Sequence, residues 1–160
     1  MTIALNAKIK DTALQMTSAT AGTAQDFKLS DFIGKTVVLY FYPKDNTPGC
    51  TNESIDFRDA HAEFLAANTV VFGVSRDSLK SHDSFKNKLE LPFELISDAD
   101  EKLCNQFDVI KQKMMYGKQV RGIERSTFIV DGNGKLKDEW RKVKVTGHVA
   151  EVLAAVRAAQ

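Results

Sequence analysis

The sequence predicts an α/β domain of three layers, and three features lead to that prediction. Segments 36–42 and 69–75 are apolar and rich in β-branched and aromatic residues, which is typical of strands covered on both faces of a sheet. Stretches with helical periodicity separate the candidate strands. The chain has 160 residues and 43% hydrophobic residues, as one globular domain would. We therefore expect a single domain over residues 1–160, with helices packed on both faces of a sheet.

The first half of the chain is predicted to contain strand 36–42, a helix over 51–67, strand 69–75 and a helix over 78–90. The first of these helices is expected to bury one face. Four apolar residues have the spacing of that face: Phe57, Ala60, Phe64 and Leu65.

The second half is predicted to continue with a strand over 93–96 and a helix over 98–107. Asp98 and Glu101 have the spacing of a capping box at the start of that helix. Three further elements are a strand at 126–130, its hairpin partner at 135–140 and a final alanine-rich helix at 148–159.

Composition excludes several classes of function. Lys and Arg number 22 against 21 Asp and Glu, so charge gives no reason to expect nucleic acid or an anionic membrane as a partner. The longest apolar run, 37–42, falls far short of the roughly 20 residues that span a bilayer. The N-terminal residues show no secretory signal, and two cysteines are too few for a disulfide framework, so we expect a reducing compartment, the cytoplasm.

The densest chemical signal is the segment 41–53, FYPKDNTPGCTNE, in which Cys50 stands where a helix is expected to begin. Unpaired N–H groups and the positive end of the helix dipole favour a thiolate over a thiol there, and the thiolate is the nucleophile. Thr47 can bring a hydroxyl to the sulfur or to a bound oxygen, while Pro43 and Pro48 stiffen the loop. The alternative is an inert cysteine buried beside a turn, and position alone does not decide between the two.

The wider sequence pattern around Cys50 decides between these two alternatives. The spacing Pro43-x-x-x-Thr47-x-x-Cys50 resembles the active-site signature of the peroxiredoxins. The longer stretches 41–51 and 122–131 are similar to the bacterioferritin comigratory protein (PrxQ) branch of that family. The resemblance covers nearly the full chain and is weakest in residues 11–27 and at the carboxyl end. It implies a thioredoxin-like three-layer α/β/α domain with a mixed central sheet, and a thiol-dependent peroxidase without a bound cofactor.

The resemblance also implies roles for individual residues. Cys50 corresponds to the peroxidatic cysteine that attacks the peroxide O–O bond, Thr47 to the hydroxyl that binds the substrate, and Pro43 to the residue that shields the sulfur. Arg125 occupies the place of the active-site arginine, which holds the thiolate and stabilises charge on the leaving oxygen. Glu53 matches a position that orients this arginine, although a carboxylate that merely favours a helix N-terminus would look the same.

The chain departs from the branch at the resolving cysteine. Many members have one five residues after the peroxidatic cysteine, where this chain has Ile55, or in the next helix, where residues 78–90 contain no cysteine. Cys104 remains as a candidate resolving residue, but we favour an unreactive buried side chain. We therefore expect a single-cysteine enzyme that reduces hydrogen peroxide and organic hydroperoxides and is recycled by an external thiol: thioredoxin, glutaredoxin or a low-molecular-weight thiol.

Four further expectations concern an alternative function, the oligomeric state, metal sites and one basic segment. A peroxide-sensing or partner-binding redox module that uses the same cysteine without efficient turnover is the alternative function. The branch is mostly monomeric, with dimers also known, so a monomer is favoured over a dimer. The three histidines lack metal-ligand spacing, so no metal site is expected. The basic segment 111–121 is interpreted as a solvated loop, with a border to the active-site mouth as the alternative.

Overall fold

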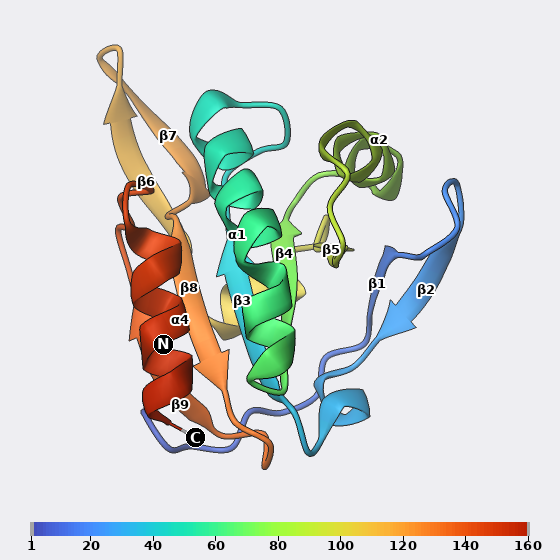
Figure 1. Ribbon diagram of the computed structural model, residues 1–160. Helices are drawn as coiled ribbons and strands as arrows, with labels where there is room; N and C mark the ends of the chain where they lie inside the picture. The colour runs from blue at the N-terminus through green and yellow to red at the C-terminus, as the bar shows by residue number, and fades with distance from the viewer. Residues whose placement is uncertain (1, 160) are drawn as a thin grey trace.

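The computed structural model describes residues 2–159 and builds them around one seven-stranded sheet (Figure 1). The strand order is β2-β1-β5-β4-β3-β8-β9. Neighbours β3–β4 and β4–β5 are parallel and the remaining neighbours are antiparallel, so the sheet is mixed as expected. The strands of the sheet are β1 (Leu14–Thr17), β2 (Ala24–Phe27), β3 (Thr36–Phe41), β4 (Thr69–Ser75), β5 (Glu94–Ser97), β8 (Ser126–Val130) and β9 (Leu136–Trp140).

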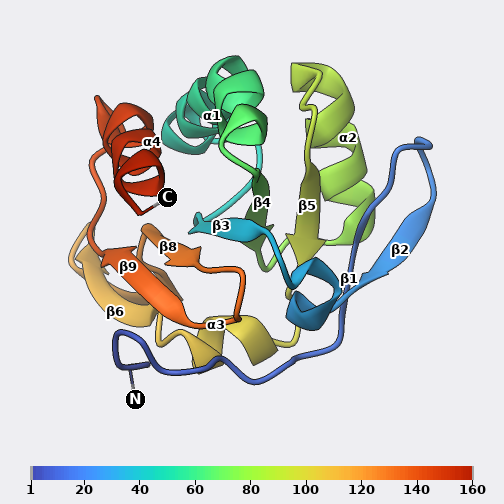
Figure 2. The same ribbon diagram turned by 60° about the horizontal axis from the view of Figure 1, so that its bottom comes forward.

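Helices cover both faces of the sheet, which confirms the thioredoxin-like three-layer α/β/α arrangement (Figure 2). One face carries α1 (Pro48–Ala66), α2 (Leu79–Leu89) and α4 (His148–Ala158). The opposite face is covered by the short helix α3 (Lys102–Gln106), and the 3-10 turn η1 (Leu29–Phe32) lies near one end of the sheet. None of the helices between residues 2 and 159 combines the length and apolar character that crossing a bilayer would need.

The sheet divides the core into two clusters, because successive side chains of a strand point to opposite faces. Cys50 belongs to the cluster under α1, α2 and α4, whereas Cys104 belongs to the cluster under α3. The side chains of β3 alternate between the two clusters. Val38 and Tyr40 lie in the cluster of Cys50, and Val37, Leu39 and Phe41 lie in the cluster of Cys104.

A close approach at Gly73 fixes α1 over the sheet. A Cβ atom added to Gly73 would lie 2.7 Å from Leu95 and 2.8 Å from the ring of Tyr40. The Tyr40 ring stacks on Phe57 of α1 with centroids 4.5 Å apart, and its hydroxyl hydrogen-bonds Ser54 Oγ at 2.9 Å. Gly73 therefore leaves the space in which Tyr40 can hold α1.

Helix α1 differs from the prediction in its first residue and in the exposure of Leu65. It begins at Pro48, three residues earlier than predicted, because proline at the first helical position needs no N–H partner. Phe57 and Phe64 are buried as expected, but Leu65 is 51% exposed. Successive helical residues lie about 100° apart, so Leu65 turns away from the face that Phe64 occupies.

The predicted capping box at Asp98 and Glu101 is wrong. Helix α3 starts at Lys102, and the Asp98 carboxylate accepts hydrogen bonds from the backbone N–H groups of Leu103 and Cys104. Glu101 instead has a left-handed backbone as the N-cap residue, and its side chain forms salt bridges with Arg121 and Arg76.

Two hairpins were not predicted as strands. Residues 111–121, interpreted as a solvated loop, belong to a separate antiparallel hairpin of β6 (Ile110–Met115) and β7 (Lys118–Ile123). The edge hairpin β1–β2 was also missed, because three of the four residues in β2 are exposed and no apolar alternation marks it.

Candidate active site

Cys50 lies in the first turn of α1, where the sequence predicted a helix start. Thr47 is the N-cap residue, with extended backbone angles, and the helix continues through Pro48 and Gly49 to Cys50. The first hydrogen bond of helical type runs from the Thr51 N–H to the Thr47 carbonyl oxygen at 2.9 Å. The N–H groups of Gly49 and Cys50 come before this bond, so they have no partner within the helix and point out of its N-terminal end.

Strand register brings Arg125 to this turn from 75 residues away in sequence. Strands β3 and β8 are antiparallel, with Phe41 paired to Ser126, so Arg125 must lie beside the residues that follow Phe41. Its Nη2 donates a hydrogen bond to Cys50 Sγ at 3.4 Å. The tertiary structure thus joins a cysteine and an arginine whose proximity the family resemblance implied and no local periodicity or spacing shows.

Glu53 accepts the second bond from the same guanidinium. Arg125 Nη1 donates to Glu53 Oε1 at 2.6 Å, and Glu53 stands one helical turn after Cys50 on the same side of α1. A Cβ atom added to Gly49 would lie 3.0 Å from Arg125 Nη2, so Gly49 provides the room in which the guanidinium reaches the sulfur.

Burial sets the electrostatics of this cluster. The Glu53 side chain is fully buried, and burial raises the pKa of its carboxyl to about 7 although the Arg125 charge acts in the opposite direction. Its Oε2 atom has no hydrogen-bond partner among residues 2–159. Burial alone would lower the pKa of Arg125, but the charges of Glu53 and Cys50 raise it, so the guanidinium stays ionised.

Thr47 and Pro43 belong to the segment that connects β3 to α1. The Thr47 hydroxyl donates to the Lys44 carbonyl oxygen at 2.8 Å, which leaves its lone pairs to accept a further hydrogen bond. Pro43 is half-buried and lines a cavity together with Arg125. Cys50 itself has no exposed surface.

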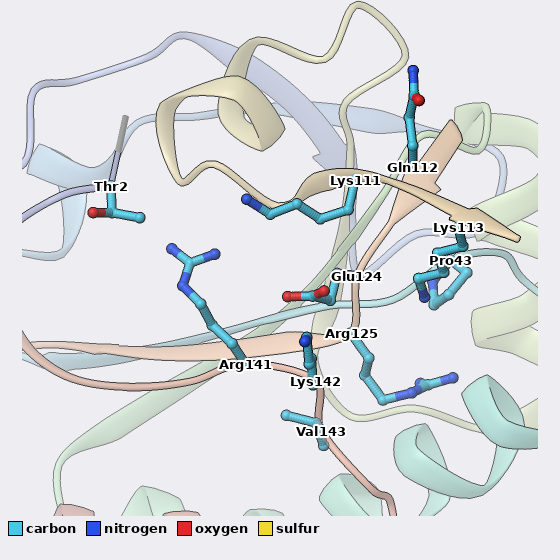
Figure 3. A pocket seen from close by; sticks show the side chains of 10 residues that line it. All are labelled: Thr2, Pro43, Lys111, Gln112, Lys113, Glu124, Arg125, Arg141, Lys142 and Val143. Carbon is cyan, nitrogen blue, oxygen red and sulfur yellow. The ribbon is translucent and has the colours of Figure 1, made fainter. Parts of the chain in front are cut away.

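The cavity beside Arg125 has a volume of about 870 Å³ and a predominantly cationic wall (Figure 3). Strand β6 supplies Lys111 and Lys113, so the alternative in which the basic segment borders the mouth of the site agrees with the structure. The segment after β9 supplies Arg141 and Lys142.

A buried polar network that sequence reasoning missed holds the active-site loop from below. The Asp45 carboxylate accepts hydrogen bonds from the Tyr42 hydroxyl at 2.7 Å and from the Ser81 hydroxyl at 2.8 Å, and it contacts His82 Nδ1 at 2.8 Å. His82 Nε2 lies 2.9 Å from the Ile96 carbonyl oxygen. These bonds attach the active-site loop to α2. No pattern in the sequence of α2 predicts this contact.

Asp77 joins the same network, and its carboxylate, that of Asp45 and the His82 ring lie within 4.8 Å of one another. Such a triad has ligand types that a cation can use. Here Asp77 already accepts bonds from the Asp45 N–H at 3.0 Å and from the Ser75 hydroxyl, and both Asp45 oxygens are bonded. The triad is therefore a satisfied hydrogen-bond network.

Cys104 lies apart from these groups. It is fully buried in the cluster on the opposite side of the sheet from Cys50, and both thiols are free. Burial and the adjacent Asp98 carboxylate raise the pKa of the Cys104 thiol far above its usual range. The structure therefore brings together Cys50, Arg125, Glu53, Thr47 and Pro43, and leaves Cys104 outside the cluster.

Comparisons with known proteins point to one family. The model of the AhpC/TSA family matches residues 5–139. Peroxiredoxin Bcp of Bacillus subtilis is 50% identical over 157 residues, which cover 98% of this chain and 97% of the relative.

Two solved structures show the same relationship. A structure of the Xanthomonas campestris bacterioferritin comigratory protein, described for its alkyl peroxide reduction activity, is 50% identical with a TM-score of 0.85 and covers 92% of this chain and 91% of its own. A cysteine-to-serine mutant of Xylella fastidiosa PrxQ is 42% identical with a TM-score of 0.91, over 99% of this chain and 98% of its own.

Proposed function

The chain belongs to the AhpC/TSA family as a peroxiredoxin of the bacterioferritin comigratory protein (PrxQ) branch, and from this premise we propose that Cys50 is its peroxidatic residue. A peroxiredoxin is a thiol-dependent peroxidase. The observation that most directly supports the role of Cys50 is the 3.4 Å contact between its Sγ and Arg125 Nη2, in the first turn of a helix. Helix N–H groups and a guanidinium both stabilise negative charge on sulfur.

The proposed reaction is a displacement at oxygen. The Cys50 thiolate attacks the terminal oxygen of a hydroperoxide, an S–O bond forms as the O–O bond breaks, and the alkoxide or hydroxide that leaves takes up a proton. Cys50 becomes a sulfenic acid, and water or an alcohol is released. Arg125 faces the charge that passes from sulfur to oxygen, so its contribution is electrostatic.

Three neighbours position the reactants in this proposal. The Thr47 hydroxyl accepts a hydrogen bond from the hydroperoxide O–H, because its own proton is donated to the Lys44 carbonyl oxygen. Pro43 closes the sulfur off from bulk water on the loop side. Glu53 holds Nη1 of the arginine and so fixes the plane of the guanidinium, which makes it a positioning residue.

We propose single-cysteine chemistry for the return step. Cys104 is buried on the other side of the sheet, and its raised pKa keeps it a thiol rather than the thiolate that would attack a sulfenic acid. An external thiol then attacks Cys50 Sγ to form a mixed disulfide and water, and a second thiol releases Cys50. The proposed setting is the cytoplasm, where such thiols are kept reduced.

Stopped-flow kinetics with matched cysteine variants test the proposal. We expect Cys50→Ser to lose peroxide consumption and Cys104→Ser to retain it. Thr47→Val and Arg125→Ala are expected to lower the second-order rate of oxidation by roughly 10²-fold or more. Intact mass after one equivalent of hydrogen peroxide should show a gain of about 16 mass units, from one oxygen, in the wild type and in Cys104→Ser.

Three outcomes would contradict this proposal. Unimpaired turnover by Cys50→Ser removes the peroxidatic role of this residue. A loss of about two mass units that disappears in Cys104→Ser shows an internal disulfide and removes the single-cysteine scheme. Oxidation that stops after one equivalent in the presence of a thiol reductant favours the peroxide sensor instead.

A further inference from the structure

The hairpin of β6 and β7 presents one face on which basic and apolar side chains are interleaved. Alternate residues of a strand share a face, and so do residues that are directly paired across antiparallel strands. The register pairs Lys113 with Val120 and Met115 with Lys118. One side of the hairpin, which we call the hairpin face, therefore carries Lys111, Lys113, Met115, Lys118 and Val120.

The positive charge of the hairpin face is largely unpaired within the protein. Residues 110–123 contain no aspartate or glutamate. Neither Lys113 nor Lys118 forms a salt bridge with another residue between 2 and 159, and Lys111 lies 3.4 Å from the Asp108 carboxylate. The balance of 22 basic and 21 acidic residues over the whole chain conceals this local excess. The hairpin face therefore offers its charge to an anionic partner.

The turn of the hairpin exposes apolar side chains that the fold does not bury. Tyr116 is 98% exposed, Met114 66% and Met115 47%. Tyr116 and Gly117 have φ angles of 53° and 78°. A two-residue turn of this kind favours asparagine before the glycine, and a bulky side chain is uncommon there. Neither packing within residues 2–159 nor turn geometry favours a tyrosine at this tip, so its presence points to a contact outside the chain.

The shape and composition of the hairpin favour a lipid surface over a protein partner. The β6–β7 sheet is separate from the seven-stranded sheet, and Figure 1 shows its turn at the outer edge of the molecule. Lysine is depleted at the centres of protein–protein interfaces, yet here lysines are interleaved with the apolar side chains. In the headgroup layer of a bilayer, by contrast, aromatic rings are favoured and lysine stems lie along apolar surface with their charges at the phosphates.

We propose that the hairpin face docks on a lipid bilayer that carries anionic headgroups, with Tyr116 and Met115 at headgroup depth. The inference goes beyond the proposed peroxidase function and does not require Cys50 to react.

The position of the hairpin relates this surface to the candidate active site. Lys111 and Lys113 of the hairpin face also line the cavity that Arg125 borders (Figure 3). Arg125 in turn contacts Cys50 Sγ at 3.4 Å. Docking through the hairpin face therefore brings the mouth of this cavity to the lipid surface.

Co-sedimentation with vesicles tests the charge requirement. Vesicles of phosphatidylcholine alone are compared, at low salt, with vesicles in which about one third of the lipid is phosphatidylglycerol. A lysine near an anionic surface increases partitioning by about fivefold, so the three lysines of the hairpin face predict a preference on the order of 100-fold for the anionic vesicles. Lys113→Gln with Lys118→Gln should reduce this preference to about fivefold. Lys80→Gln with Lys102→Gln, which removes two exposed charges outside the hairpin, should preserve it.

Variants at the tip test the apolar contact. Met115→Ser with Tyr116→Ser should lower binding to the anionic vesicles about tenfold. Ile33→Ser, at a 58% exposed apolar position outside the hairpin, should leave binding unchanged. Tyr116→Trp reports depth: its emission should be quenched by brominated lipid in anionic vesicles, whereas emission of the wild type, whose single tryptophan is Trp140, should not be.

A wild type without preference for anionic vesicles, or an equal loss of binding in both lysine pairs, would overturn the proposal. So would emission of Tyr116→Trp that brominated lipid leaves unquenched. If the hairpin variants instead change the oligomeric state, measured by size-exclusion chromatography with light scattering, the hairpin face is a protein interface and the bilayer assignment is wrong. Cys50→Ser should bind vesicles like the wild type, so failure of the peroxidatic role and failure of lipid docking are distinguished.

Discussion

At the scale of single residues, Arg125 is shared by two acidic groups. One guanidinium nitrogen faces Glu53 Oε1 and the other faces Cys50 Sγ. A fully buried carboxylate costs several kcal/mol unless it is paired, and Glu53 has only one of its oxygens bonded among residues 2–159. In the role that we propose for it, Glu53 orients the arginine at the expense of stability near neutral pH.

The raised pKa of Glu53 gives a stability effect with a definite sign. Its folded-state pKa, about 7, lies above the value of 4.5 expected for an exposed glutamate, so the folded protein binds the proton more tightly. The resulting stabilisation is complete below about pH 4.5 and is lost as the pH rises through about 7.

We therefore expect Glu53→Gln to gain free energy of unfolding relative to the wild type as the pH increases from 4.5 to 8, by an amount on the order of 2–3 kcal/mol. Urea denaturation of both proteins across this range measures the difference. Glu63→Gln, an exposed position on the same helix, should show no such change. A constant difference between wild type and Glu53→Gln would show that folding does not raise the pKa of Glu53.

Gly49 gives a second prediction at this scale. A Cβ atom at this position would lie 3.0 Å from Arg125 Nη2, the atom that bonds Cys50 Sγ. The guanidinium is the end of a flexible side chain and can move, so Gly49→Ala should fold well but lose the contact with the sulfur. We expect the oxidation rate to fall about tenfold with an unchanged or higher Tm, since alanine favours the helix. An unchanged rate would indicate that this contact contributes little.

At the scale of elements, the site depends on a loop that is fixed at both ends. Strand β3 and helix α1 are each packed in the core, and between them Asp45 is bonded to Tyr42, Ser81 and His82. Because His82 belongs to α2 and bonds the Ile96 carbonyl oxygen of β5, the loop is attached to two elements outside its own sequence neighbourhood.

Removing His82 from this network should loosen the loop. His82→Leu keeps a similar volume but removes one of the three side-chain bonds to the buried Asp45 carboxylate, together with the bond to the Ile96 carbonyl oxygen. We expect a loss of about 3 kcal/mol in the free energy of unfolding, measured with urea. Ser81→Ala removes one less buried bond to the same carboxylate and should cost about 1 kcal/mol. Equal effects of the two variants would mean that the network is not centred on His82.

At the scale of the whole molecule, the sheet keeps the two cysteines in separate cores. Cys50 packs under α1, α2 and α4, and Cys104 packs under α3. A disulfide requires the two Cα atoms to approach within about 7 Å, and an intact sheet stands between the side chains.

This separation predicts that oxidation depends on the fold. With the thiol oxidant diamide, we expect no internal disulfide in the native protein and a loss of about two mass units in 8 M urea. Cys104→Ser serves as the control, since it cannot form the bond in either condition. Rapid formation of the disulfide under native conditions would show that the cores open readily and that Cys104 can act as a resolving residue.

Local patterns were sufficient for most elements of the fold. The apolar strands β3 and β4, the helices α2 and α4 and the β8–β9 hairpin each lie within a few residues of their predicted bounds. The prediction missed elements whose residues are polar or exposed, such as β2 and β6, because hydrophobic periodicity is absent there.

For the site, too, local sequence predicted some features and only the tertiary structure decided others. The sequence by itself determined that Cys50 stands at a helix start after a buried strand, because chain connectivity and helix geometry are local properties. Only the tertiary structure decided that Arg125 reaches Cys50, that Asp45 meets His82, and that Cys104 lies across the sheet. These contacts follow from strand register and layer packing, which bring together residues far apart in the chain and leave no pattern at either position.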